Sequence, residues 1–169
     1  MDSATWGFIG VLVGSLIGAA ASIVTTAINN WNASRLQKNS NDFERQELAR
    51  AFQRDNLLKL QDALQDSVRF ASQAHFEDQK EYLKNGEWGK AMLSISIDEN
   101  LLESNRKLSI LTERIESNEL RSEIKKFRHK VTDSLSTKSQ SEAKAIIADI
   151  ATSFPVLIEK LGETLRRNY

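Results

Sequence analysis

The feature that most constrains this chain is its N-terminal segment, in which no charged residue lies between Asp2 and Arg35. From Trp6 to Ile28 the only polar side chains are four hydroxyls, those of Ser15, Ser22, Thr25 and Thr26. About 20 consecutive apolar residues are enough to cross the hydrocarbon core of a bilayer. The segment therefore predicts a transmembrane helix, which we place at residues 6–31 after a short outer tail at residues 1–5.

The residues that flank this segment predict its orientation. Along a helix, Trp6 and Trp31 would lie about 38 Å apart, near the two headgroup regions where indole rings are favoured, so both are expected to be interfacial anchors. No Lys or Arg precedes the segment, whereas Arg35, Lys38, Arg45 and Arg50 follow it. Because cytoplasmic flanks are enriched in Lys and Arg, we expect a single-pass protein of the cell membrane (the inner membrane if it is bacterial). Its N-terminus would face out, and the larger C-terminal domain would be cytoplasmic.

Two other interpretations of the segment stay open. A cleavable signal peptide normally has a basic start and an apolar core of about 7–15 residues. Here the only charge before the run is Asp2 and the run is longer, although Ala19-Ala20-Ala21 resembles a cleavage site. The second alternative is a helix buried in the core of a soluble protein. The length of the run and its missing basic start favour the membrane helix.

Small residues recur on one side of this predicted helix. A glycine destabilises a helix interior by about 1 kcal/mol relative to alanine, so the repeat predicts a compensating gain in packing. At about 100° per residue, the small residues face away from the bulky ones, and we expect them to form a helix–helix contact: Gly7, Gly10, Gly14, Gly18 and Ser22. Small residues four apart let two backbones approach closely in lipid.

The spacing of these glycines also resembles a known pattern. Gly10, Gly14 and Gly18 match the glycine zipper, G-x3-G-x3-G, of membrane oligomers and some channel-forming helices. The resemblance implies a homo-oligomer. The alternative is that glycine is simply common in membrane helices. A pore is a bolder interpretation, because the segment has no charged residue to line one.

The rest of the chain predicts an all-α fold. A polar juxtamembrane linker at residues 32–40 precedes Asn41-Asp42-Phe43-Glu44, whose spacing is typical of a helix start, so we expect a long helix from about residue 41 to 83. Its apolar residues recur at steps mostly of three and four and are expected to be buried: Leu48, Phe52, Leu57, Leu60, Leu64, Val68 and Ala71. Residues 84–90 contain Asn-Gly and a second glycine, which predicts a reversal of the chain.

Three further helices are expected. One carries a row from Leu93 to Ile115, although residues 93–97 also alternate as a strand would. Ser117-Asn118 predicts the start of the next, which ends in a serine-rich loop at residues 134–141. Pro155 should kink the last helix or start a new one after Thr152 or Ser153. Packed together, residues 41–169 predict an antiparallel cytoplasmic helical bundle. Residues 41–83 could instead form an intermolecular coiled coil, although no strict heptad is sustained.

Catalytic and metal-binding signals are thin. The chain has no cysteine, which excludes disulfides and thiol chemistry. His75 and His129 lack any partner at ligand spacing, and no phosphate-binding or nucleophile motif occurs. We therefore expect no catalytic residue, no metal and no cofactor, and a protein that is not an enzyme.

One basic cluster is a candidate binding site. Residues 35–169 hold 23 Lys and Arg against 22 Asp and Glu, a net charge of +1, so nucleic acid is not an expected partner. Within this neutral background five cations crowd one predicted helix, as an anion or lipid patch would require: Arg121, Lys125, Lys126, Arg128 and Lys130. The alternative is a solvated helix flank whose charge is offset by neighbouring acids.

Two functions fit this layout. The first is a membrane-anchored protein that self-associates through its span and acts as a structural, effector or signalling component. The second is a tethered binding module, whose cytoplasmic part recruits a protein, an anionic lipid or nucleic acid.

Overall fold

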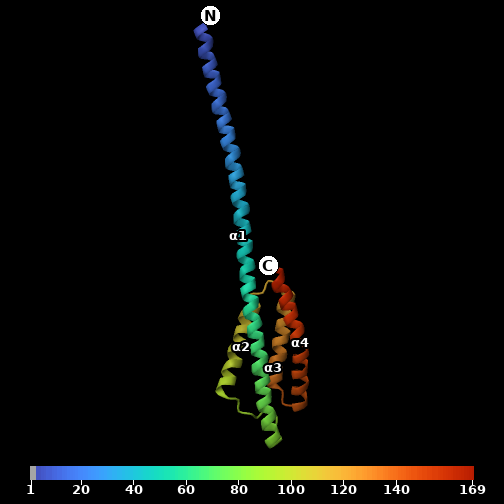
Figure 1. Cartoon of the computed structure of the whole chain (residues 1–169). Helices are drawn as coiled ribbons and strands as arrows, with labels where there is room; N and C mark the ends of the chain where they lie inside the picture. Colours follow the sequence, from blue (N-terminus) through green and yellow to red (C-terminus); the bar gives the residue numbers. More distant parts are fainter. Residues whose placement is uncertain (1–2) are drawn as a thin grey trace. The chain divides into compact units, whose positions relative to one another are not determined.

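The computed structural model describes the backbone of residues 3–169, together with the side chains of Gly7, Gly10, Val11 and residues 13–169. Within these residues the chain is helical and contains no strand, in agreement with the predicted all-α class. Figure 1 shows its four helices. They are α1 (Ser3–Asn85), α2 (Ile95–Glu113), α3 (Asn118–Ser136) and α4 (Gln140–Arg167).

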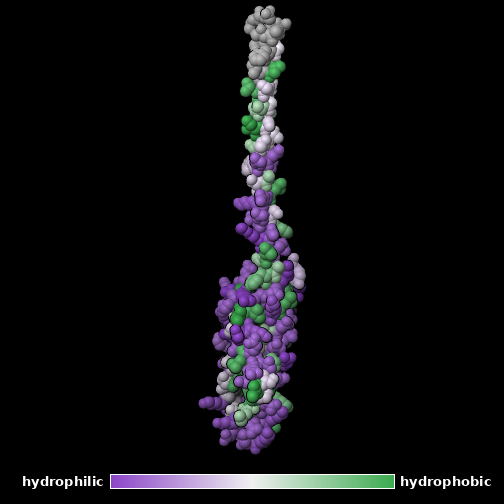
Figure 2. All heavy atoms as spheres, turned by 90° about the vertical axis from the view of Figure 1, so that its left-hand side faces the viewer, coloured by the Kyte–Doolittle hydropathy of each residue, from purple (hydrophilic) through white to green (hydrophobic). Residues whose placement is uncertain are grey.

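The chain divides into two compact units, residues 1–48 and residues 49–169. The first unit is the N-terminal part of α1. All of its described side chains are exposed except that of Glu47, which is half-buried. Figure 2 shows this part first with pale and green apolar side chains and then with purple polar ones. No other part of the described chain covers its apolar residues.

The predicted helix start at Asn41 is wrong. Residues 32–40 are helical, and α1 passes through Asn41 without a cap. The physical reason is that no glycine or proline lies anywhere from residue 19 to residue 85. Polar side chains such as those of Asn and Ser lower helix propensity by only a few tenths of a kcal/mol, so they do not end a helix that continues on both sides.

The second unit, residues 49–169, is built around a single core. Side chains from all four helices contribute to it, and its most deeply buried members include Leu60 and Leu64 of α1, Leu108 of α2, Ile124 of α3 and Leu161 of α4. Buried apolar side chains recur at helical spacing along the two last helices, Leu120, Ile124, Phe127 and Val131 on α3 and Ile150, Leu157 and Leu161 on α4. These rows are the faces that the helices turn toward each other.

The predicted row of α1 is wrong at its N-terminal end. Leu48 and Phe52 are 65% and 50% exposed, whereas burial begins at Asn56 and Leu57. A helical period alone says which face of a helix is apolar. It does not say where along the helix a partner exists, and the core residues of the other helices pack only from Leu57 onward.

Serine side chains cap the three shorter helices. Ser94, Ser117 and Ser139 accept hydrogen bonds from the backbone N–H groups of Ile97, Leu120 and Glu142, at 3.3, 3.2 and 3.5 Å. The predicted cap at Ser117 is confirmed, and residues 95–97 are helix rather than strand. The predicted turn after α1 is also present, because Gly86 and Gly89 adopt φ of 74° and 71°, a conformation that favours glycine.

Two predicted breaks are smaller than expected. The loop predicted at residues 134–141 shrinks to residues 137–139, because the Ser134 and Ser136 hydroxyls donate to the carbonyls of Val131 and Thr132 within α3. Pro155 does not start a new helix, since α4 runs through it. Proline removes one backbone hydrogen bond to the residue four positions earlier. That residue, Ala151, is exposed, as is Pro155, so water is available to the unpaired carbonyl.

Amide side chains of α1 hold the connection between α2 and α3. Asn56 Nδ2 donates to the carbonyl of Leu111 at 3.0 Å. Gln53 Nε2 donates to the carbonyl of Arg114 at 3.0 Å, and its Oε1 accepts from the N–H of Glu116 at 3.2 Å. These donors of α1 supplement the backbone bonds at the end of α2, where the N–H groups of Arg114 and Ile115 donate to the carbonyls of Leu111 and Thr112, both at 3.2 Å.

Candidate functional site

The small-residue face lies on the exposed part of α1. Gly7, Gly10, Gly14, Gly18 and Ser22 are all exposed. A Cβ atom added to any of the four glycines would meet no atom within 4 Å, apart from the helix's own neighbouring backbone. Among the described residues, none packs against these glycines.

One helix of the described chain is long and apolar enough to cross a membrane, and its apolar window lies near the N-terminus with none of it buried. A core helix of a soluble protein and a signal sequence can share this composition. Trp31, one predicted interfacial anchor, is 73% exposed. The side chain of Trp6, the other, lies outside the described residues.

Most of the predicted basic patch is engaged within the second unit. Arg121 donates to the carbonyl of Ile115 and, at 3.0 Å, to Asn118 Oδ1, and Arg128 donates to Ser109 Oγ. Lys125 pairs with Glu113 at 2.6 Å, and this hydrogen bond lowers the pKa of the Glu113 carboxyl. The patch is therefore not a uniform cationic surface: Arg121 bonds the connection between α2 and α3, and Arg128 bonds α2 itself.

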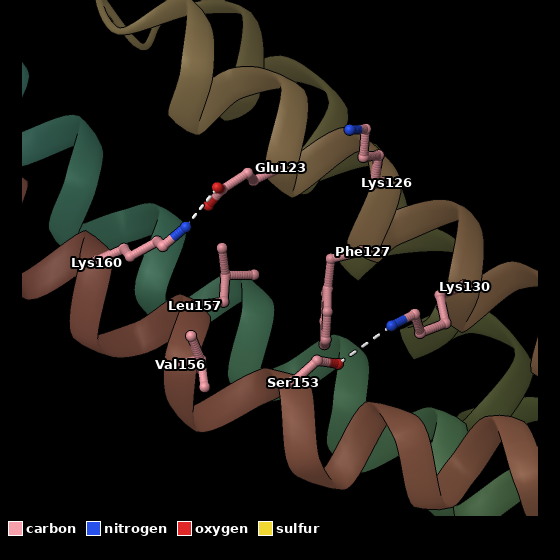
Figure 3. A pocket seen from close by; sticks show the side chains of 8 residues that line it. All are labelled: Glu123, Lys126, Phe127, Lys130, Ser153, Val156, Leu157 and Lys160. Atoms are coloured by element: carbon pink, nitrogen blue, oxygen red, sulfur yellow. Dashed lines mark hydrogen bonds and ion pairs between the residues drawn. The ribbon is translucent and has the colours of Figure 1, made fainter.

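The two remaining lysines of the patch, Lys126 and Lys130, lie on the rim of a groove between α3 and α4 (Figure 3). The groove has a volume of about 290 Å³. Its lining consists of Glu123, Lys126, Phe127 and Lys130 from α3, and Ser153, Val156, Leu157 and Lys160 from α4. Each set has the spacing i, i+3, i+4, i+7, which places its members on one face of a helix.

Two cross-helix pairs close the ends of this groove. Lys160 of α4 pairs with Glu123 of α3, which raises the pKa of the lysine. At the other end Lys130 pairs with Asp149 at 2.6 Å and donates to Ser153 Oγ at 3.4 Å. Between them Phe127 and Leu157 form an apolar floor, and Val156 is 54% exposed beside them. Sequence reasoning identified Lys126 and Lys130 but missed the four residues of α4, because only packing brings the two helices together.

Lys126 differs from the other cations of the groove. Among the described residues it has no ion pair and no hydrogen bond, its side chain is exposed, and Figure 3 draws it without a dashed line to any labelled residue. Its charge is therefore available to a ligand without breaking an existing contact.

The two histidines differ in exposure and in their neighbours. His129 is exposed on α3, whereas His75 is half-buried against Trp88, with ring centroids 5.2 Å apart. Burial is the main reason that the pKa of His75 lies below its usual value, partly opposed by Asp78. Across the part of the chain that the structure describes, no group of three or more His, Cys, Asp or Glu side chains is arranged to hold a metal ion.

Comparison with known proteins adds no assignment. No protein family, curated protein or solved structure gives a match to this chain. Function is therefore argued from the residues alone.

Proposed function

We propose that this chain is a single-pass membrane protein that self-associates through the small-residue face of α1 and acts as a structural, effector or signalling component. The observation that carries the proposal is the exposed glycine row. Four glycines and Ser22 lie on one face and are exposed, and no described residue packs against the glycines. Glycines in a helix interior lower its stability. A second copy of the helix in lipid would offset that loss, because the glycines would let the two backbones pack closely.

The membrane part of the proposal rests on length, composition and exposure. An uncharged apolar helix with no covering side chains is unfavourable in water, since its apolar surface would remain hydrated at about 25 cal/mol per Å². In a bilayer the same surface is solvated by acyl chains, and the helix satisfies its own backbone hydrogen bonds. The Lys and Arg residues after the span favour a cytoplasmic C-terminal unit.

The decisive experiment for self-association is Gly14→Ile in the full-length protein. Gly14 is the middle glycine of the row, so a branched side chain there would hold two backbones apart. We expect chemical cross-linking in membranes, with a reagent that needs no cysteine, to yield oligomers of the unaltered chain. For the variant the oligomer fraction should be at least tenfold smaller. Val13→Ile enlarges a residue on the opposite face and should leave the oligomers unchanged. Equal loss in both variants would contradict a specific contact face.

A tethered binding module is the second candidate. The observation that favours it is the groove between α3 and α4, with the unpaired Lys126 at its rim. In this alternative the span is only an anchor. Gly14→Ile would then leave function intact, whereas substitutions in the groove would abolish it.

A further inference from the structure

The groove between α3 and α4 has the dimensions of a small-molecule site. The lining of α4 extends from Ser153 to Lys160 and that of α3 from Glu123 to Lys130, which is about 10 Å at about 1.5 Å per residue. Cross-helix pairs close both ends. A docked helix of several turns would collide with these pairs. The volume of about 290 Å³ lies at the lower limit of small-ligand pockets, about 300 Å³.

The floor of the groove is apolar along this length. Phe127 and Leu157 each leave 5% of their surface exposed, while Val156 beside them remains largely uncovered. Each methylene group that moves from water onto such a floor stabilises the complex. The floor therefore favours a ligand with an apolar chain, and the length of the groove favours a short chain.

The rim supplies one unneutralised positive charge. Lys130 and Lys160 already have carboxylate partners in Asp149 and Glu123. Lys126 has none among the described residues. A ligand with a single negative charge at one end would pair with Lys126 and leave both end pairs intact. A dianionic head or a two-chain lipid exceeds either the charge or the room of the site.

We propose that this groove binds a single-chain monoanionic amphiphile, a medium-chain carboxylate, with the carboxylate on Lys126 and the alkyl chain along Phe127, Val156 and Leu157. The site lies wholly within the second unit. It does not depend on membrane insertion or on self-association through α1.

The test uses the full-length protein in phosphatidylcholine nanodiscs and radiolabelled octanoate in equilibrium dialysis, with empty nanodiscs as the blank. We expect saturable binding of one octanoate per chain above the blank. Lys126→Gln should weaken it roughly two- to fivefold, the range for a solvent-accessible charge pair. Val156→Gln should also weaken it, and because Val156 is exposed the substitution should not disturb the core. Lys138→Gln is the matched control, since Lys138 is exposed and lies outside the groove.

Photo-cross-linking with a diazirine derivative of octanoate locates the ligand. Labelled peptides covering residues 123–130 and 153–160 would support the proposal. It is overturned by binding no greater than the blank, by octanol binding as tightly as octanoate, by labels confined to other segments, or by an equal effect of Lys138→Gln. If Lys126→Gln instead diminishes cross-links between chains and leaves octanoate binding unchanged, the groove is filled by a second copy and the proposal is wrong.

Discussion

At the scale of single residues, two amide side chains of α1 form hydrogen bonds to segments that are distant in the sequence. Asn56 is 2% exposed, and its Nδ2 group donates a hydrogen bond to the carbonyl of Leu111. Gln53 donates to the carbonyl of Arg114 and accepts from the N–H of Glu116, two residues of the connection between α2 and α3. These contacts join residues more than 50 positions apart, so no local sequence pattern predicts them.

Asn56 offers the first stability prediction. Replacing it with Ala removes one of the two donors to the carbonyl of Leu111 and leaves the N–H of Arg114 at 3.2 Å, which should lower the free energy of unfolding by about 0.5–1.5 kcal/mol. Urea denaturation followed by circular dichroism measures the change. Gln65→Ala, at an exposed position of α1, should alter stability by less than about 0.5 kcal/mol. A similar loss in both variants would show that shortening any α1 amide, rather than losing this bond, is responsible.

His75 predicts a pH dependence of stability. Its pKa in the folded chain lies below the usual 6.5, mainly because of burial, with Asp78 opposing and Lys144 adding to the shift. As pH falls below about 6.5, the unfolded chain takes up this proton first, so the free energy of unfolding declines until the folded chain also binds it. Above that window His75 contributes no slope.

The measurement compares urea denaturation at pH 7.5 and 5.5. His75→Gln should show a smaller loss on acidification than the unaltered chain. His129→Gln removes the exposed histidine and serves as the control. If the two variants have the same pH slope, burial of His75 does not affect stability in this range.

At the scale of elements, local hydrogen-bonding rules account for the capped starts of α2, α3 and α4 and for the turn after α1. They do not account for how far a helix continues through an unfavourable residue. Serines cap α2, α3 and α4, and positive φ at Gly86 and Gly89 lets the chain leave α1. The same local reasoning misplaces a helix start at Asn41, and α4 runs through Pro155 without a new start. In both places the helix continues because flanking turns on each side remain helical and a single unfavourable residue does not outweigh them.

Ser117→Ala tests the cap of α3. The hydroxyl accepts from the N–H of Leu120, and loss of such a cap lowers stability by about 1 kcal/mol. Thermal unfolding should therefore shift downward by a few degrees. Ser122→Ala removes a hydroxyl from the exposed interior of the same helix and should be neutral or slightly stabilising, because alanine is the better helix former.

At the scale of the whole molecule, the two units have opposite relationships to solvent. The second unit buries its apolar rows in one shared core, whereas the apolar residues of the first unit remain uncovered. A protein with this division needs either lipid or another protein surface for its first unit. Membrane insertion is the solution that we propose.

Extraction and truncation test that solution together. Full-length protein should stay with vesicles washed in alkaline carbonate, because a spanning helix is not released by high pH. A chain lacking residues 3–31 should move to the supernatant and keep the far-ultraviolet circular dichroism of a helical protein. Release of the full-length chain by carbonate would contradict the transmembrane assignment.

By itself, the sequence determined the features that depend on neighbours along the chain: the helical class, the uncharged N-terminal segment, the cap at Ser117 and the turn at Gly86. It also determined which faces of the helices are apolar, because the helical period is a local property. Only the tertiary structure decided that burial along α1 begins at Leu57, that most of the basic patch is paired, and that Lys126 borders a groove with Val156 and Leu157. These depend on which helices meet and where along each helix they meet, and the apolar period of a single helix specifies neither.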